Sequence, residues 1–207
     1  MKAIDSDGFE LKFQDNIDPW NYTASPFEHF KREVLLRACG CRTYGRGLEL
    51  ACAIGETTRY LARRCLRLLA VDSSHTALRE AERRLQGMRR VTLQQVRLPR
   101  ETPRGPFDLI VASEIVYYLT PRELLELLHR VDVALAPGGR IVVLDHCRPF
   151  DDAAQLPELA HRRVRMKLQK TMHVVFHQRH NRFDVLAFEK PQYGKAAQAN
   201  AGLTTTA

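Results

Sequence analysis

The sequence contains no long hydrophobic run. No stretch of 18 apolar residues occurs in the 207-residue chain, and a membrane-spanning helix needs about 20. The first 15 residues, MKAIDSDGFELKFQD, are too polar and acidic for a signal peptide. We therefore expect no membrane partner and a cytoplasmic location.

Cysteine is scarce as well. The chain has five cysteines, and none of them forms a C-x-x-C pair. Structural zinc sites and disulfide frameworks both depend on paired or regularly spaced cysteines. The sequence therefore predicts neither a metal site nor a disulfide scaffold.

A concentrated basic surface is also missing, although the net charge is +8 and the sequence pI is about 9.5. The arginines are scattered, and the densest group, HRRVRMKLQK at residues 161–170, lacks interleaved aromatic residues. Charge runs of this kind are usually solvated helix faces. We favour that interpretation over a nucleic-acid contact, and a nucleic-acid partner is not expected.

The length and composition suit one globular domain. Hydrophobic residues make up 44% of the chain and charged residues 27%, which is enough apolar material for a core. We expect a single domain over residues 1–191, in which residues 1–30 form an N-terminal lid or entry segment and residues 1–26 are irregular. Residues 192–207 are small and polar, and we expect a disordered tail there.

Short apolar strands alternate with helices along most of the chain, which predicts a largely parallel sheet covered on both faces. The last two strands are separated by polar residues and predict a hairpin. A turn is expected at residues 136–139. The expected helices cover residues 26–38, 56–64, 75–85, 121–135 and 156–170, and the expected strands residues 47–50, 66–71, 91–96, 107–113, 140–144, 173–177 and 182–189.

The most informative segment begins at the first strand. Glu49 lies in that strand and is followed by a turn of small residues, and the second strand ends in Asp72. Small side chains let the backbone approach a ligand, and an acid at this strand end can bind both ribose hydroxyls. The order of strand, turn, helix, strand and acid therefore predicts a nucleoside site.

A pyrophosphate loop of the type G-x-G-x-x-G is absent. The small residues stand two apart, at Ala51, Ala53 and Gly55, and Glu56 at the helix start would repel a pyrophosphate. A cationic ligand suits acids at these positions better. The pattern resembles motif I and its partner acid in the class I S-adenosylmethionine-dependent methyltransferases, although Ala51 stands where those enzymes usually have glycine. The resemblance implies S-adenosylmethionine as the cofactor.

Further motifs resemble those of a narrower group. The segments DPWNYTASPFEHFK, FDLIVASEIVYYL and LAPGG resemble the corresponding segments of the nodulation N-methyltransferases. This resemblance implies a Rossmann-like class I methyltransferase fold, an α/β fold whose mostly parallel seven-stranded sheet has a C-terminal antiparallel hairpin and helices on both faces. It also implies transfer of a methyl group to the free amine of a de-N-acetylated chitooligosaccharide.

Ligands of open α/β sheets bind beyond the carboxyl ends of the strands, and this rule selects the candidate site residues. Position 97, after the third strand, holds an arginine, which cannot accept a hydrogen bond from adenine. Gln95, the backbone, or packing alone could hold the base. The expected cofactor-binding residues are Trp20, Glu49, Ala51, Cys52, Ala53, Gly55, Asp72, Ser73, Gln95, Ser113 and Glu114.

The acceptor amine must be neutral when it attacks, so a nearby carboxylate or histidine could take its proton. Glu114 and His146 are the candidates for this role, with Asp145 as an alternative, and Tyr117 rather than Tyr118 is expected to face the acceptor. Glu114 could equally be a helix-start acid, and His146 a structural residue. The aromatic side chains Trp20, Tyr22 and Phe27 could form either a lid over the cofactor or a hydrophobic plug.

Three other functions stay open. A small-molecule O-methyltransferase would need the same cofactor site. A methyltransferase acting on base amino groups is disfavoured, because residues 113–116 read SEIV where such enzymes resemble one another in a (D/N)-P-P-(Y/F) motif. A non-catalytic nucleoside-binding protein is allowed by Ala51 and Arg97. The oligomeric state cannot be inferred.

Overall fold

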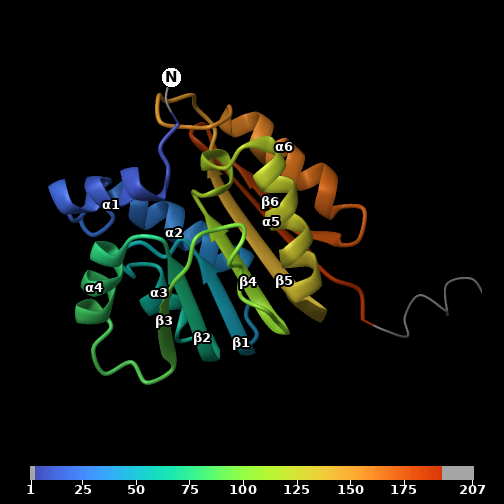
Figure 1. Cartoon of the computed structure of the whole chain (residues 1–207). Coiled ribbons are helices and arrows are strands. Elements are labelled where there is room, and N and C mark those ends of the chain that lie inside the picture. Colours follow the sequence, from blue (N-terminus) through green and yellow to red (C-terminus); the bar gives the residue numbers. More distant parts are fainter. Residues whose placement is uncertain (1–2, 193–207) are drawn as a thin grey trace, which may run out of the picture.

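A computed structural model describes residues 3–192 of the chain (Figure 1). Its seven-stranded sheet has the order β3-β2-β1-β4-β5-β7-β6. The strands are β1 (Tyr44–Leu50), β2 (Cys65–Asp72), β3 (Val91–Gln95), β4 (Phe107–Ser113), β5 (Leu135–His146), β6 (His173–Arg179) and β7 (Phe183–Glu189). The helices are α1 (Ser6–Asp15), α2 (Pro26–Ala38), α3 (Thr58–Leu61), α4 (His75–Arg84), the short 3-10 helix η1 (Val116–Tyr118), α5 (Pro121–Ala134) and α6 (Pro157–Leu168).

Strand directions confirm the predicted architecture. Strands β1 to β5 pair in parallel, β7 runs antiparallel to β5, and β6 antiparallel to β7. Six strands therefore share one direction, and β6 with β7 forms the predicted hairpin. The strand order reverses between β1 and β4, and such a switch point leaves a crevice at the carboxyl ends of the strands.

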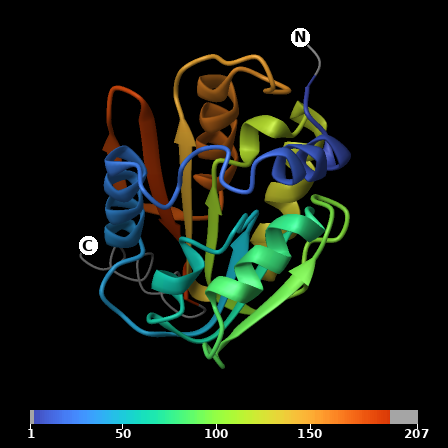
Figure 2. The same cartoon turned by 90° about the vertical axis from the view of Figure 1, so that its left-hand side faces the viewer.

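Helices cover both faces of the sheet, because the inner strands carry apolar side chains on both sides. On one face α5 and α6 pack over a cluster that includes Leu48, Ile110 and Val143. On the other face α2 and α3 pack over a second cluster around Tyr44 and Val142. Figure 2 shows α2, α3 and α4 on the near side of the sheet.

Helix starts follow the local sequence closely. At α5, Thr120 is the N-cap and forms a complete capping box with Glu123, a pairing that satisfies two otherwise free N–H groups. At α4 the cap is Ser74, and its hydroxyl accepts a hydrogen bond from the N–H of Ala77 at 3.0 Å.

Three predictions of local structure, for residues 1–26, 56–64 and 136–139, are wrong. Residues 1–26, expected to be irregular, contain α1, which Asp5 caps through the N–H of Gly8. Only Phe13 of this helix is buried, so the sequence lacks a wide apolar face that would predict the helix. Contacts with distant segments, such as those of Glu10 and Lys12, hold it in place. The helix expected over residues 56–64 is shortened to α3.

The turn predicted at residues 136–139 lies inside β5, which begins at Leu135. The glycines are accommodated by a register shift between β4 and β5 and by hydrogen bonds between the backbone of Lys190 and residues Gly138 and Gly139. Of the predicted disordered tail, residues 193–207 lie outside the described part of the chain. Between residues 3 and 192, no helix is long and apolar enough to cross a membrane.

Candidate functional site

A cavity of about 750 Å³ lies beyond the carboxyl ends of the strands, a volume typical of small-molecule sites. Its floor is formed by the turn after β1, by Asp72 and Ser73 after β2, and by residues 113–120 after β4. Helix α1 and the loop between β5 and α6 form the opposite wall, on the side where Figure 1 shows α1 and the N-terminus. The cavity therefore occupies the predicted location.

The turn after β1 has an unusual backbone. Ala51 and Ala53 adopt left-handed φ angles of 55° and 49°, a conformation that costs an L-residue about 1–2 kcal/mol. Both alanines line the cavity. Small residues in this conformation turn the backbone sharply and keep it accessible to a ligand.

Two predicted cofactor contacts in this turn do not face the large cavity. Gly55 has a φ of 77°, and a Cβ there would lie 3.0–3.1 Å from Leu85 and Ala81. The absence of a side chain at Gly55 therefore allows close packing against α4. The Cys52 side chain is buried in a small cluster with Ala70 and Leu78.

Asp72 is buried at the end of β2 and lines the cavity. Its Oδ2 accepts a hydrogen bond from the N–H of Ala53 at 2.8 Å, and its Oδ1 accepts one from the N–H of Ser74 at 2.9 Å. Burial raises the pKa of Asp72, and these backbone hydrogen bonds oppose the rise. Each carboxylate oxygen keeps a second lone pair, so Asp72 can still accept hydrogen bonds from two ribose hydroxyls.

The predicted adenine side of the cavity is apolar. Val96 and Leu98 line it, whereas the Gln95 side-chain amide donates to the backbone oxygen of Ser73 at 2.8 Å. Arg97 points away and pairs with Asp7 of α1 at 2.8 Å. Of the three alternatives for holding adenine, this arrangement favours packing.

Glu49 faces a separate small cavity of about 40 Å³ between α2 and the turn. The side chain is buried, and among residues 3–192 its Oε2 has no hydrogen-bond partner. Burial, with the negative charge of Asp72, raises the pKa of Glu49 to about 8. The raised pKa favours the neutral form of this carboxyl group near pH 7.

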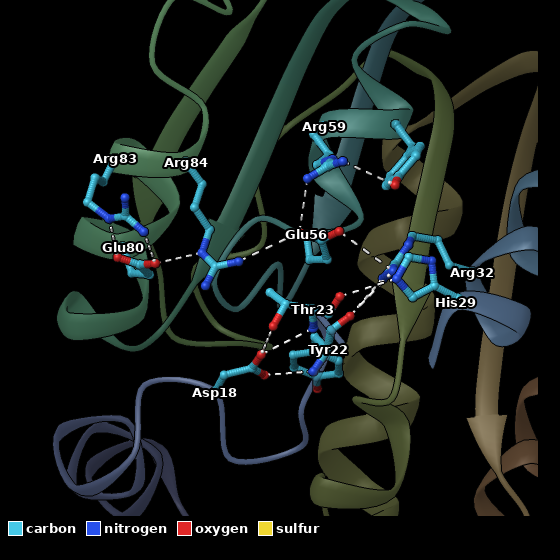
Figure 3. Close-up of polar contacts among 11 residues, drawn as sticks. Asp18, Tyr22, Thr23, His29, Arg32, Glu56, Arg59, Glu80, Arg83 and Arg84 are labelled. Atoms are coloured by element: carbon cyan, nitrogen blue, oxygen red, sulfur yellow. Dashed lines mark hydrogen bonds and ion pairs between the residues drawn. The ribbon is translucent and has the colours of Figure 1, made fainter. Parts of the chain in front are cut away.

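Glu56, which was expected to repel a pyrophosphate from the helix start, does not line the large cavity. The carboxylate is buried among Arg32, Arg59 and Arg84, at 3.6, 3.5 and 3.7 Å (Figure 3). These arginines come from α2, α3 and α4. Glu56 thus joins the end of the turn to three helices, and its charge is compensated.

The segment DPWNYT is held by its own aspartate. The Asp18 carboxylate accepts hydrogen bonds from the N–H groups of Tyr22 and Thr23 at 2.7 and 3.1 Å (Figure 3). Trp20 and Tyr22 both line the cavity and also pack around Phe13. The packing agrees with the predicted plug, and the role of a lid over the cofactor stays a prediction.

Phe27 lies apart from these two rings. It lines the cavity near α2, with the guanidinium of Arg182 3.9 Å from its ring centroid and the ring of Phe183 at 5.8 Å. The predicted three-residue aromatic cluster is therefore divided between two parts of the wall.

Glu114 has a φ of 58° and is held by three partners. Its Oε1 accepts from the Lys31 ammonium at 2.5 Å, and its Oε2 accepts from the Tyr117 hydroxyl and from the N–H of His146. Burial raises the pKa of Glu114, but Lys31 and these hydrogen bonds outweigh it, and the net pKa is lowered. The structure thus brings the three predicted catalytic residues together around one ionised carboxylate.

The neighbouring candidates are placed differently. The rings of Tyr117 and Tyr118 both line the cavity, although only one was expected to face it. Burial lowers the pKa of His146, which lines the cavity near Phe150. Asp145 is fully buried and points away from the cavity toward His161 of α6, whose Nδ1 lies 2.7 Å from its Oδ2.

Helix α1 is tied to both sides of the cavity. Glu10 accepts hydrogen bonds from the hydroxyls of Ser74 and Thr76 at 2.7 and 2.6 Å. On the other side, Lys12 pairs with Asp152, and the N–H of Ile4 donates to the Asp152 backbone oxygen at 3.0 Å. This helix was not predicted from the sequence, where its one local signal is the Asp-x-x-Gly start at residues 5–8.

Lys31 and Glu28 of α2 were also missed, although both line the cavity. Their i, i+3 spacing on a predicted helix indicated a pair, but sequence alone does not place that pair against Glu114. Among residues 3–192, no group of three or more His, Cys, Asp or Glu side chains is arranged to hold a metal ion.

The lining fits S-adenosylmethionine. Asp72 has acceptor capacity for ribose hydroxyls, Val96 and Leu98 offer an apolar surface to adenine, and aromatic rings attract a sulfonium. The left-handed alanines provide a close backbone approach. The residues beside the cavity that would hold the cofactor are Trp20, Ala51, Ala53, Asp72, Ser73, Ser113 and Glu114.

Comparisons with known sequences give a consistent result. A family model described as a methyltransferase domain matches residues 48–141. Nodulation protein S of Rhizobium tropici is 31% identical over 153 residues, which cover 68% of this chain and 63% of that protein. Nodulation protein S of Bradyrhizobium diazoefficiens is 33% identical over 113 residues, 53% of this chain and 52% of that protein. The chain thus spans between about half and just under two thirds of these relatives.

Solved structures resemble the chain over more of its length. The crystal structure of a putative methyltransferase from Pseudomonas syringae is 31% identical with a TM-score of 0.69, and the match covers 79% of this chain and 99% of that one. The N-methyltransferase NodS from Bradyrhizobium japonicum WM9, in complex with S-adenosyl-l-homocysteine, has a TM-score of 0.75 at 24% identity, covering 88% of this chain and 98% of that one. This second likeness shows the fold alone.

Proposed function

Since the chain belongs to the class I S-adenosylmethionine-dependent methyltransferases, we propose that it transfers a methyl group to the free amine of a small molecule or of an amino sugar, such as a de-N-acetylated chitooligosaccharide. One observation carries this proposal. The cavity is lined by Asp72 and by the turn at Ala51 and Ala53, to which we assign the nucleoside, and its wall also contains the largely buried carboxylates of Glu28 and Glu114. A negative wall suits an acceptor that arrives as a cation. The relatives named nodulation protein S support the amino-sugar alternative.

When bound, S-adenosylmethionine supplies a methyl group activated by its positively charged sulfur. The protein has to hold the acceptor in line with that methyl group and exclude water. Asp72, Ser73 and the turn at Ala51 and Ala53 hold the nucleoside in this proposal. Trp20 and α1 close the cavity above it.

The acceptor wall consists of Glu114, Tyr117 and His146. In this proposal, Glu114 holds the Tyr117 hydroxyl and the His146 backbone through its hydrogen bonds, and the rings of Tyr117 and His146 shape the space for the amine. Loss of the His146 imidazole, in His146→Ala, is then expected to lower turnover and leave cofactor affinity unchanged.

A methyl-transfer assay against a panel of amines tests the proposal. The panel includes chitooligosaccharides in the acetylated and the de-N-acetylated form. The free amine should be methylated and the acetylated form should not, because an amide nitrogen is a poor nucleophile. Equal activity on both glycans would exclude amine methylation and indicate a hydroxyl acceptor.

A further inference from the structure

A buried lysine connects two carboxylates in the wall of the cavity. The Lys31 ammonium lies 3.0 Å from Glu28 Oε1 and 2.5 Å from Glu114 Oε1. The three side chains are only 8%, 13% and 14% exposed for Lys31, Glu28 and Glu114. Two negative charges thus share one positive charge, and the group as a whole favours an additional cation.

Glu114 is poorly suited to accept a proton. Lys31 occupies its Oε1, and the Tyr117 hydroxyl and the His146 N–H occupy its Oε2. A proton on Oε2 would displace one of its two donors, and a proton on Oε1 would compete with the Lys31 ammonium for the same negative charge. The net lowering of its pKa has the same origin.

Glu28 has the free oxygen that Glu114 lacks. Its Oε1 binds Lys31, and among the described residues its Oε2 makes no hydrogen bond. The side chain lines the cavity. Burial raises the pKa of Glu28, and the Lys31 charge only partly opposes this effect, which brings the carboxylate closer to the range in which a base works well.

The helix start does not explain this orientation of Glu28. Residues 25–28 read SPFE and residues 120–123 read TPRE, so both segments fit the capping-box pattern. At Thr120 the box is complete, because Glu123 accepts from the N–H of Thr120 at 2.9 Å. At Ser25 it is open, because the Ser25 N–H bonds to Asn21 O at 3.0 Å and Glu28 turns to Lys31 instead.

We infer that Glu28 is the group that removes the proton from an ammonium acceptor, with Lys31 and Glu114 as its positioning residues. The inference rests on the proposed amine methylation. The N–H bond of the ammonium breaks, its proton joins Glu28 Oε2, and the electron pair stays on nitrogen as the neutral nucleophile. The charged or titratable groups that act on Glu28 or share its cavities include Lys31 and Arg32 on α2, Tyr22 before it, Glu114 after β4, His146 after β5 and Arg182 before β7.

Three variants test this role in methyl-transfer assays across pH. Glu28→Gln keeps the shape of the side chain and removes the base, Glu28→Asp keeps a carboxylate, and Glu33→Gln is a matched control on the exposed face of the same helix. General-base catalysis contributes about 100-fold or more. Glu28→Gln should therefore lose at least about 100-fold in kcat/KM where the acceptor is protonated, and should approach the wild-type rate at high pH, where solvent deprotonates the amine.

Glu28→Asp should recover part of the low-pH rate, and Glu33→Gln should match the wild type. A purely structural role would lower the rate equally at every pH, and that result would overturn the inference. Equal rates of Glu28→Gln and wild type would overturn it too. In both cases amine methylation by the wild type still stands.

Two further measurements separate the inference from the proposed function. Calorimetry with S-adenosylhomocysteine should give equal affinities for Glu28→Gln and wild type. In the S-adenosylhomocysteine complex, the carboxyl carbon of Glu28, followed by NMR, should titrate above the ordinary range of glutamate. Titration of Glu28 in or below that range would contradict the inference. If the wild-type protein binds the cofactor but methylates no amine, both the inference and the proposed function are contradicted.

Discussion

Asp72 and Ala53 are joined by a hydrogen bond across 19 residues of sequence, from the Ala53 N–H to Asp72 Oδ2 at 2.8 Å. The bond links the acid at the end of β2 to the turn after β1. The position of the carboxylate and the shape of the turn are therefore set together. A substitution at Asp72 changes both the ligand contact and the backbone that faces the ligand.

Asp72→Ala should weaken S-adenosylmethionine binding at least about ten-fold, because a hydrogen bond to a charged group contributes about 1.5–3 kcal/mol and about 1.4 kcal/mol equals a factor of ten. Calorimetry on the folded variant measures this loss. Asp108→Ala is the control, since Asp108 also accepts a hydrogen bond from a backbone N–H, that of Arg46 at 2.7 Å, but lies at the other end of the sheet. Unchanged affinity in Asp72→Ala would refute the ribose contact.

Ala51→Gly should maintain or improve both stability and cofactor affinity. The left-handed φ of Ala51 costs about 1–2 kcal/mol, and glycine removes that cost while adding about 0.5–1 kcal/mol of backbone entropy. Urea unfolding and calorimetry measure the two effects. A clear loss of affinity in a stable variant would show that the alanine methyl makes a useful contact with the ligand.

Titration of Glu49 should lower the free energy of unfolding as pH rises from about 4.5 to about 8. Its folded pKa of about 8 exceeds the ordinary value, so the folded state keeps a proton that the unfolded chain has released. The loss is at most about 1.4 kcal/mol per pH unit in this window. Glu49→Gln should remove this dependence, which urea unfolding at pH 5 and pH 7.5 would reveal as a smaller difference than in the wild type.

His161→Ala should destabilise the protein by about 3–5 kcal/mol, because it leaves the fully buried Asp145 without its partner. His129→Ala, on an exposed position of α5, is the control and should stay within about 0.5 kcal/mol of the wild type. Urea unfolding near neutral pH compares the two variants. Equal stability of both would show that the Asp145–His161 pair has no structural importance.

The sheet was predictable because its signals are local. The strand over residues 107–113 and the helix over residues 26–38 were placed with their observed limits, since apolar runs and caps mark them. Asp72 was found for the same reason, as an acid at a strand end. Its contacts with the ligand itself stay a prediction.

The remaining features depend on contacts between distant segments. Helix α1 has little apolar periodicity of its own and is held by Glu10 and Lys12 across the cavity. Lys31 acquires its role only when α2 brings it to Glu114, 83 residues away. No pattern within either segment contains that information.

The loop between β5 and α6 is bonded to η1, because the N–H groups of Ala154 and Gln155 donate to the backbone oxygen of Tyr117 at 2.9 and 3.3 Å. The ring of Phe150 in this loop lies 5.0 Å from that of Tyr117 and 5.8 Å from that of Tyr118. Substitutions in the two segments should therefore be non-additive. A library intended to redirect the protein to a new acceptor should randomise Tyr118 and Phe150 jointly, because single-site libraries would miss compatible pairs.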